Sequence, residues 1–310
     1  MSTQAIGRKQ ERQGSRLGEL TRIAQKLHRG NRVALGVLWA LAGLITLLFI
    51  AIIVILFLQG FGYLINPAFY SFADNGVGRQ IFNTFYILIL SEVFLFPIAL
   101  AAAIYTVEYA PQGRLVASIR FAAETLAGVP SIVLGLFGFV FFSAFLGFHI
   151  SRLSGALTLL CLNFPQAFRL FEDALMSVPR DLREGSLALG TTRWLTIRKV
   201  VLPSALPGLI TGLILSAGKI IGETAALVYT MGVSSPASVF SLDPSIPSDT
   251  LTIHLWYIKT QGAGSIVGLT AADSSAISSG SAALLIIVLL VINLLARGVG
   301  RMIQRRVMAA

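Results

Sequence analysis

Residues 35–58 read LGVLWALAGLITLLFIAIIVILFL and contain no charged side chain. A helix needs roughly 20 apolar residues to cross the hydrocarbon core of a bilayer, so this run predicts a transmembrane helix. A secretory signal peptide is the competing interpretation. The run is too long for one, it starts only after 32 residues, and no small-residue cleavage site follows it. We therefore expect a membrane span.

The composition of the whole chain also indicates a bilayer location. Hydrophobic residues make up 55% of the 310 residues, charged residues only 12%, and the mean hydropathy is +0.79. A soluble domain carries about 25% charged residues, so this chain lacks the charge to cover a water-facing surface. We expect an all-α membrane protein with six transmembrane helices, in which Pro97 and Pro130 break or tilt the second and third. The five further apolar runs lie at about 81–105, 119–148, 154–172, 206–230 and 280–298.

The distribution of Lys and Arg predicts the orientation of these spans. Twenty of the 24 basic residues fall in the tail 1–32, in the link 106–120, in the link 173–205 with Arg169 just before it, and at the C-terminal end. Because short basic loops stay in the cytoplasm, we expect both termini there. The tail 1–32 then needs no nucleic-acid partner, since a basic segment near anionic lipid explains the net charge of +10. Residues 33–310 are expected to form the membrane domain.

Sequence patterns for catalysis are missing. The single cysteine, Cys161, excludes an intrachain disulfide, and the three histidines are scattered without zinc-site spacing. Gly218-Lys219 resembles the end of a nucleotide-binding P-loop, but Gly212 is one residue too far upstream and Ile220 replaces Ser or Thr. No nucleophile elbow of the G-x-S-x-G type occurs. We expect no enzyme activity, metal or cofactor in this chain, so its energy comes from an ion gradient or a partner.

The run at 206–230 has one face of small and polar residues. On a continuous helix over Pro207–Gly232, Ser216, Lys219 and Glu223 lie on that face, and Lys219 and Glu223 are one turn apart. A charge at mid-bilayer costs about 2.5–3.5 kcal/mol, and pairing of the two side chains reduces that cost. A solute pathway and a structural ion pair that locks helices are the two interpretations. We take Ser216, Lys219, Glu223 and Thr224 as pathway candidates. Weaker candidates are Glu92 and Glu124.

The cytoplasmic link at about 177–205 carries a second pattern. Glu184 is followed by Gly185-Ser186, then by Gly190, and further on by Leu202-Pro203. This order predicts a short helix, a glycine break, a second amphipathic helix and a proline that opens the next span. An ordinary connector is the alternative, but about 30 residues is long for a connector. On the other side of the membrane, the loop at about 231–279 contains an apolar stretch, Thr250–Thr260, expected at the membrane interface.

The cytoplasmic pattern resembles the EAA loop of binding-protein-dependent ABC importer permeases, with Gly185 and Ser186 in place of its central alanines. Three further stretches resemble the PstA-type permease of phosphate importers rather than its PstC-type partner. These are EYA at 108–110, LAGVPSIVLGLFG at 126–138 and GETAAL at 222–227. The resemblance runs through about residues 80–300 and implies the MetI-like fold of a type I importer half-channel.

The same resemblance implies a function and partners. The chain would be one permease of an ATP-driven phosphate importer in a prokaryotic inner membrane, and it would form the pathway together with a PstC-type permease. Two ATPase subunits, which carry the ATP and Mg²⁺, would bind the cytoplasmic loop, and an external phosphate-binding protein would dock on the other side. The residues implied in coupling are Glu184, Gly185, Ser186, Gly190, Leu202 and Pro203.

Other functions stay open at this point. Relatives usually carry Arg where this chain has Lys219, and a lysine offers a point charge rather than a two-pronged hydrogen-bonding group. The nearest alternative is a permease for another oxyanion, sulfate or molybdate. A secondary transporter that uses Glu223, and a membrane scaffold that moves nothing, are the alternatives from other classes. A docking loop for an ATPase argues against the secondary transporter.

Overall fold

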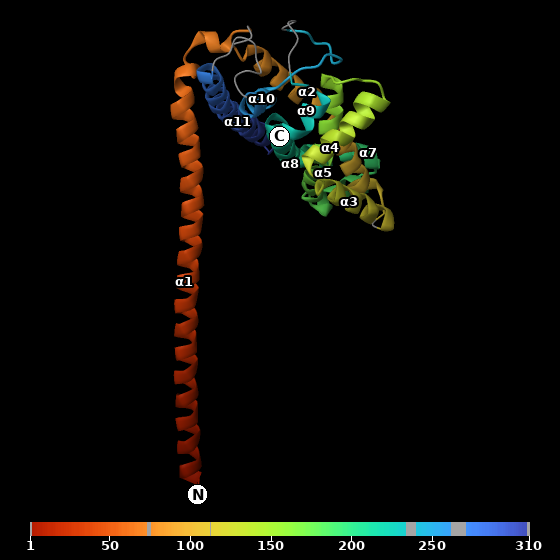
Figure 1. The fold of residues 1–310 in the computed structure, drawn as a ribbon. Coiled ribbons are helices and arrows are strands. Elements are labelled where there is room, and N and C mark those ends of the chain that lie inside the picture. Colours follow the sequence, from red (N-terminus) through yellow and green to blue (C-terminus); the bar gives the residue numbers. More distant parts are fainter. Residues whose placement is uncertain (1, 73–75, 112, 234–239, 262–270, 309–310) are drawn as a thin grey trace. The chain divides into compact units, whose positions relative to one another are not determined.

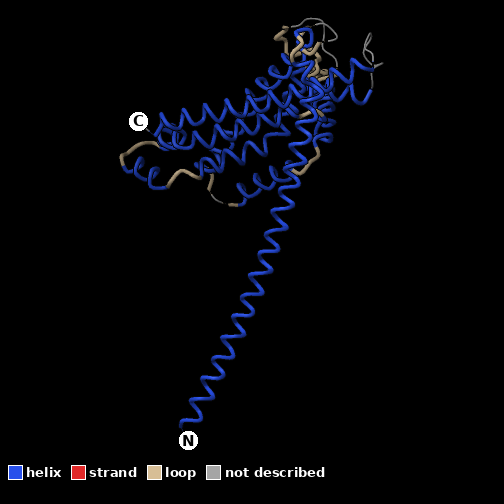
Figure 2. The backbone as a smooth tube through the Cα atoms, turned by 90° about the vertical axis from the view of Figure 1, so that its left-hand side faces the viewer, coloured by secondary structure: helices blue, strands red, loops and turns tan. Residues whose placement is uncertain are grey.

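The computed structural model describes residues 2–72, 76–111, 113–233, 240–261 and 271–308. Within these ranges the regular structure is helical and contains no strand, as the tube in Figure 2 shows. The chain divides into two compact units, Met1–Ile55 and Leu56–Ala310. Helix α1 (Ser2–Leu64) is one unbroken helix (Figure 1) and passes residue 32 without a break. The division of a basic tail from a membrane domain at that residue stays a prediction.

Among the described residues, four helices are long and apolar enough to cross a membrane. They are Asn31–Leu64 of α1, Gly78–Tyr109, Arg193–Gly222 and Ile277–Leu295. A fifth span results if the bent pair Arg114–Ala127 and Ser131–Phe145 counts as one. Six were expected. The remaining expected run, 154–172, lies in α5 (Arg152–Met176), which does not pass the same test of length and composition.

Helix α5 forms the centre of the second unit. It packs against α2 (Gly78–Ile104) on one side and α8 (Leu202–Gly222) on another. Phe168 and Phe171 are each only 1% exposed, and they belong to the largest apolar cluster of this unit. Because protein rather than lipid surrounds α5, it tolerates buried polar side chains such as Asn163 and Glu172. This burial explains why its apolar signal is weaker than that of the lipid-facing helices.

The expected proline effects differ between the two helices. Helix α2 continues through Pro97 and ends in a π-helical turn, η2 (Tyr105–Tyr109). The break at Pro130 is confirmed: α3 (Arg114–Ala127) ends before it, and α4 (Ser131–Gly138) begins after it at an angle of 101°. A second π-helical segment, η3 (Phe139–Phe145), extends α4. Pro130 is the N-cap of α4, a position whose missing N–H would have no partner within the helix, so the proline costs no hydrogen bond there.

The expected continuous helix over Pro207–Gly232 is wrong. Helix α8 ends at Gly222, Glu223 is extended (φ −74°, ψ 130°), and a short helix α9 (Ala225–Thr230) follows. On the cytoplasmic link, α6 (Arg180–Ala188) is followed by α7 (Arg193–Thr196) and the π-helical η4 (Ile197–Val201), which runs into α8. The short helix, glycine break and second helix expected there are therefore present.

The segment expected to form an external loop is more structured than predicted. Within it, α10 (Leu251–Gln261) covers most of the apolar stretch Thr250–Thr260. Outside this segment, the 3-10 helix η1 (Pro67–Tyr70) follows α1. Residues Leu251, Ile253 and Ile258 of α10 are buried, and α10 packs against α2 and α11 (Ala271–Met308). The last helix thus begins inside the expected loop 231–279. Tertiary packing, which a local apolar pattern does not reveal, holds α10 in place.

Candidate coupling surface and translocation pathway

The turn of the cytoplasmic link is closed by three hydroxyl groups. Ser186 Oγ lies 2.9 Å from Thr191 Oγ1 and 3.0 Å from Thr196 Oγ1, and the two threonine oxygens are 2.9 Å apart. Thr191 also donates to the Ser186 carbonyl at 2.8 Å. Gly190 has φ +81°, a left-handed conformation that favours glycine. These contacts give the link a defined shape instead of that of a loose connector.

The outer surface of this link carries apolar side chains. Leu189 is 85% exposed and Trp194 is 56% exposed, and they lie among the charged residues of α6 and α7. Large exposed apolar groups among charged residues mark a candidate interaction surface. The neighbouring exposed apolar residues are Leu182, Leu187 and Leu195. We call this set the docking surface.

The sequence-predicted coupling residues lie at or near the docking surface. Glu184 and Gly185 are exposed on α6, and Gly190 is exposed in the turn. Leu202 and Pro203 are half-buried at the start of α8, where the proline occupies the first turn. Helices α7, η4 and α8 follow one another without a gap, so the part of the docking surface on α7 is continuous with α8.

Small residues on α8 permit a close approach to α5. A side-chain Cβ at Gly208 would lie 2.6 Å from the Ala174 Cβ, and one at Gly212 would lie 2.8 Å from Phe171 Cε1. Larger residues at these two positions would force the helices apart. The predicted face of small residues on this helix therefore serves helix packing in its N-terminal half.

The other end of α8 is open. A Cβ at Gly218 or Gly222 would meet nothing within 4 Å, and the Lys219 side chain is exposed. No described residue of this chain covers that side of α8. The exposed lysine therefore lies beside two glycines that have no neighbour within this chain.

The predicted ion pair between Lys219 and Glu223 is absent from the described residues. Glu223 Oε1 instead accepts the Ala226 backbone N–H at 3.2 Å, and the Glu223 carbonyl accepts the Thr252 hydroxyl at 3.1 Å. The helix break explains the difference, because extended backbone at Glu223 removes the one-turn spacing that pairing needs. Thr224 occupies the position just before α9 and is half-buried.

Ser216 is held by a residue on another helix. It is 1% exposed, and its hydroxyl donates to Glu92 Oε1 at 2.5 Å. Glu92 lies on α2 and lines an apolar groove of about 600 Å³ between α2, α8 and α11. Sequence reasoning listed Glu92 only as a weaker candidate, because nothing in the local pattern predicts that α2 and α8 meet there. Of the four pathway candidates, Lys219 is the exposed one, while Ser216 and Glu223 are engaged in structure.

Two of the stretches that carried the resemblance pack against each other. Gly135 of α4 lies so close to α9 that a Cβ there would be 2.7 Å from the Ala226 Cα. Leu134 and Ala226 belong to one buried cluster. The glycine is thus required by the approach of another backbone. The break after Gly222 is what turns α9 toward α4.

A buried polar network lies around the start of α5, and sequence reasoning missed it. Arg152 is 1% exposed and donates to Asn83 Oδ1 at 2.6 Å and to Ser248 Oγ at 2.8 Å, and it also bonds the Ser241 carbonyl. Nearby, His254 Nδ1 lies 2.9 Å from Asp249 Oδ2. These residues are up to about 170 positions apart in the chain, so spacing gave no signal. The network fixes residues 241–250 against α2 and α5.

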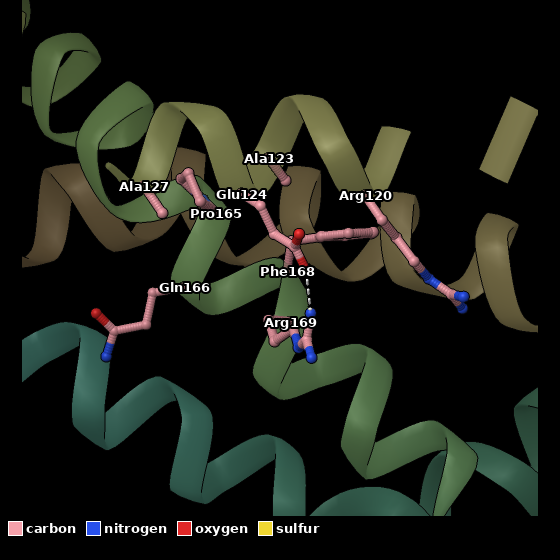
Figure 3. A pocket seen from close by; sticks show the side chains of 8 residues that line it. All are labelled: Arg120, Ala123, Glu124, Ala127, Pro165, Gln166, Phe168 and Arg169. Atoms are coloured by element: carbon pink, nitrogen blue, oxygen red, sulfur yellow. Dashed lines mark hydrogen bonds and ion pairs between the residues drawn. The ribbon is translucent and has the colours of Figure 1, made fainter. Parts of the chain in front are cut away.

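A small cavity of about 190 Å³ lies between α3 and α5. Figure 3 shows Glu124 of α3 and Arg169 of α5 facing each other at its edge, and their ion pair measures 2.7 Å. Arg120, also on its rim, pairs with Glu172, whose side chain is 2% exposed. Both arginines of the cavity therefore already have carboxylate partners.

Comparison with known proteins places these features in context. The model of the family described as "Binding-protein-dependent transport system inner membrane component" matches residues 95–309. The probable ABC transporter permease protein YqgI of Bacillus subtilis (strain 168) is 38% identical over 247 residues, which are 76% of this chain and 82% of that protein. Phosphate transport system permease protein PstA 1 of Mycobacterium tuberculosis (strain ATCC 25618 / H37Rv) is 36% identical over 190 residues, 61% of each chain.

Solved structures resemble the fold as well. A chain of the inward-facing MetNI methionine ABC transporter matches with a TM-score of 0.60 at 21% identity, covering 73% of this chain and 95% of that chain. A chain of a bacterial ABC transporter that imports the acidic polysaccharide alginate matches with a TM-score of 0.56 at 18% identity, over 72% and 78% of the two chains. At these identities the likeness is one of fold.

Proposed function

The chain belongs to the family of binding-protein-dependent transport system inner membrane components, and on that premise we propose that it is a permease subunit of an ATP-driven phosphate importer. The single observation that carries the proposal is the docking surface: an ordered, exposed and apolar turn that continues without a gap into α8. The phosphate specificity is supported by the relatives named as phosphate permeases.

The pathway in this proposal lies along the open side of α8. A bare oxyanion in a low-dielectric passage is strongly disfavoured, and a cation on the path lowers that barrier. Lys219 is exposed beside Gly218 and Gly222, so its ammonium group is free to interact with a passing phosphate. A second permease of the PstC type then supplies the other wall of the path. Because Glu223 is occupied by the backbone of α9, it is not a pathway residue in this proposal.

The remaining partners follow from the two faces of the membrane domain. Two cytoplasmic ATPase subunits, which hold the ATP and Mg²⁺, bind the docking surface. An external phosphate-binding protein docks on the opposite face, which includes residues 240–250. Both termini lie in the cytoplasm, as the distribution of basic residues predicts. The chain itself hydrolyses nothing.

Uptake by cells tests the substrate. Deletion of this chain from its host should abolish ATP-dependent uptake of labelled phosphate at low external concentration, and the restored gene should return it. Unlabelled phosphate should compete in the restored strain, whereas sulfate and molybdate should not. If the deletion strain instead lost uptake of sulfate or molybdate and kept uptake of phosphate, phosphate would be the wrong substrate and that other oxyanion the right one.

A further inference from the structure

Arg183, on the docking helix α6, turns its guanidinium group away from the exposed surface. Its Nε and Nη2 atoms donate to Glu108 Oε1 at 3.1 and 2.9 Å. The Arg183 and Glu108 side chains are only 17% and 12% exposed. The same guanidinium donates from Nη1 to the Val178 carbonyl at 2.5 Å and from Nη2 to the Leu175 carbonyl at 2.7 Å. All of its nitrogen atoms are therefore engaged.

These partners belong to different elements. Glu108 lies in η2, the π-helical end of α2, while Leu175 and Val178 lie at and just after the end of α5. The Leu175 carbonyl also accepts the Val178 backbone N–H at 3.3 Å, so the arginine adds a charged donor to the C-terminal end of α5, where a cation is favourable. π-Helical turns frequently mark functional positions in helices. One side chain thus joins the docking helix to the cytoplasmic ends of two central helices.

Apart from α7 and η4, which continue into α8, the rest of α6 has little hold on the membrane helices. Glu184, Gly185 and the apolar residues of α6 are exposed, and α6 packs mainly on α7 and η4. Within the described part of the chain, the pair of Arg183 and Glu108 is the one ion pair that leaves α6. A force applied to α6 is therefore carried to α2 and α5 through this contact.

We propose that Arg183 and Glu108 are positioning residues that transmit movement of the docked ATPase to α5 and α2, and so to the pathway. The inference rests on the proposed function, because it requires an ATPase at the docking surface. Helix α5 touches α8 at Gly208 and Gly212 with almost no space between them. A displacement of α5 therefore moves α8, which carries Lys219. Movement of the docking surface also reaches α8 directly, because the chain continues from α7 through η4 into α8. In this proposal the ion pair makes α5 and α2 move together with η4 and α8.

The chain provides a matched control for this pair. Arg120 Nε and Nη2 donate to a single oxygen of Glu172, Oε1, at 2.9 and 2.7 Å, in the same geometry as Arg183 and Glu108. Glu172 is even more deeply buried, at 2% exposure. This pair joins α3 to α5 and has no contact with the docking helix. If breaking a buried ion pair only lowers stability, variants of both pairs will show the same defect. If the Arg183–Glu108 pair couples the ATPase to transport, only its variants will lose coupling.

The test uses the complete transporter in proteoliposomes, with ATP inside and binding protein outside, and counts phosphate imported per ATP hydrolysed. Arg183→Ala should lower this ratio about five- to a hundredfold, the usual range for coupling between two sites. Glu108→Gln should lower it less, because an amide oxygen still accepts one hydrogen bond. Arg120→Ala should lower the amount of assembled complex, but the ratio of phosphate imported to ATP hydrolysed should stay at the wild-type value.

A wild-type ratio for Arg183→Ala in assembled complex would overturn the proposal. If that variant fails to assemble, the ratio of Glu108→Gln decides, and a wild-type value there also overturns it. If the wild-type complex hydrolyses ATP but imports no phosphate, the proposed substrate is wrong, and the coupling through Arg183 is measured by a second assay. Stimulation of ATP hydrolysis by the external binding protein should then be lost in Arg183→Ala and kept in Arg120→Ala.

Discussion

Substitution of Gly190 separates the shape of the docking turn from contact with a partner. Its φ of +81° costs a residue with a Cβ about 1–2 kcal/mol, except for Asn, which adopts this conformation more readily. Within this chain a Cβ at Gly190 meets nothing within 4 Å. Hydroxyl groups hold the turn: Thr191 donates to the Ser186 carbonyl, and the Ser186 and Thr196 protons serve two of the three hydroxyl pairs. Each of these hydrogen bonds contributes about 0.5–1.5 kcal/mol net. The turn should therefore survive Gly190→Ala and Gly190→Asn.

Gly190→Arg should have a different outcome. Arg carries the same backbone cost as Ala, and its long charged side chain also projects from the docking surface, where it should obstruct the ATPase. We expect the Arg variant to insert at wild-type level and to lose uptake. The Ala variant should lose no more than about 30-fold, the factor that corresponds to about 2 kcal/mol, and the Asn variant should lose least. Membrane content, copurified ATPase and phosphate uptake are measured together. Normal uptake by Gly190→Arg would refute the assignment of this turn as the dock.

Three further predictions address the pathway, the packing and the topology. Lys219→Arg should retain phosphate uptake and Lys219→Met should lose it. Adding Glu223→Gln to the Met variant should not restore uptake, because the two side chains are not paired. Recovery in the double variant would favour a structural ion pair instead. Gly212→Val should lower the unfolding temperature of the detergent-solubilised complex, since overpacking costs about 1–3 kcal/mol; Gly218→Val should not, and equal shifts would contradict the packing described. Reporter fusions at both termini should read as cytoplasmic and one near Ser245 as external; an external C-terminus would contradict this orientation.

Much of the fold could be predicted from local sequence. The apolar runs gave the membrane helices, Pro130 gave the break between α3 and α4, and Gly190 gave the turn after α6. Each of these depends on a property of one short segment: length of an apolar run, a missing N–H group, or freedom to adopt positive φ. The resemblance to importer permeases came from the same kind of local stretch, and the family match confirmed it.

Features that depend on tertiary contacts were missed or mistaken. Helix α5 was expected as an ordinary span, but its surroundings are protein. The break at Glu223 follows from packing of α9 on α4 through Gly135 and Ala226, which helical periodicity does not reveal. The partners of Ser216 and Arg183 lie 124 and 75 residues away in the chain. Residue type alone therefore identified the charged candidates but not their partners.

The central claim is that ATP hydrolysis on a partner drives phosphate through this chain. The most direct measurement is uptake of labelled phosphate into proteoliposomes that contain the complete transporter, with and without internal ATP, and with ionophores that collapse ion gradients. We predict uptake that requires internal ATP and external binding protein and that is unchanged by ionophores. Uptake that proceeds without ATP and stops when the ion gradient collapses would contradict the account and identify a secondary transporter.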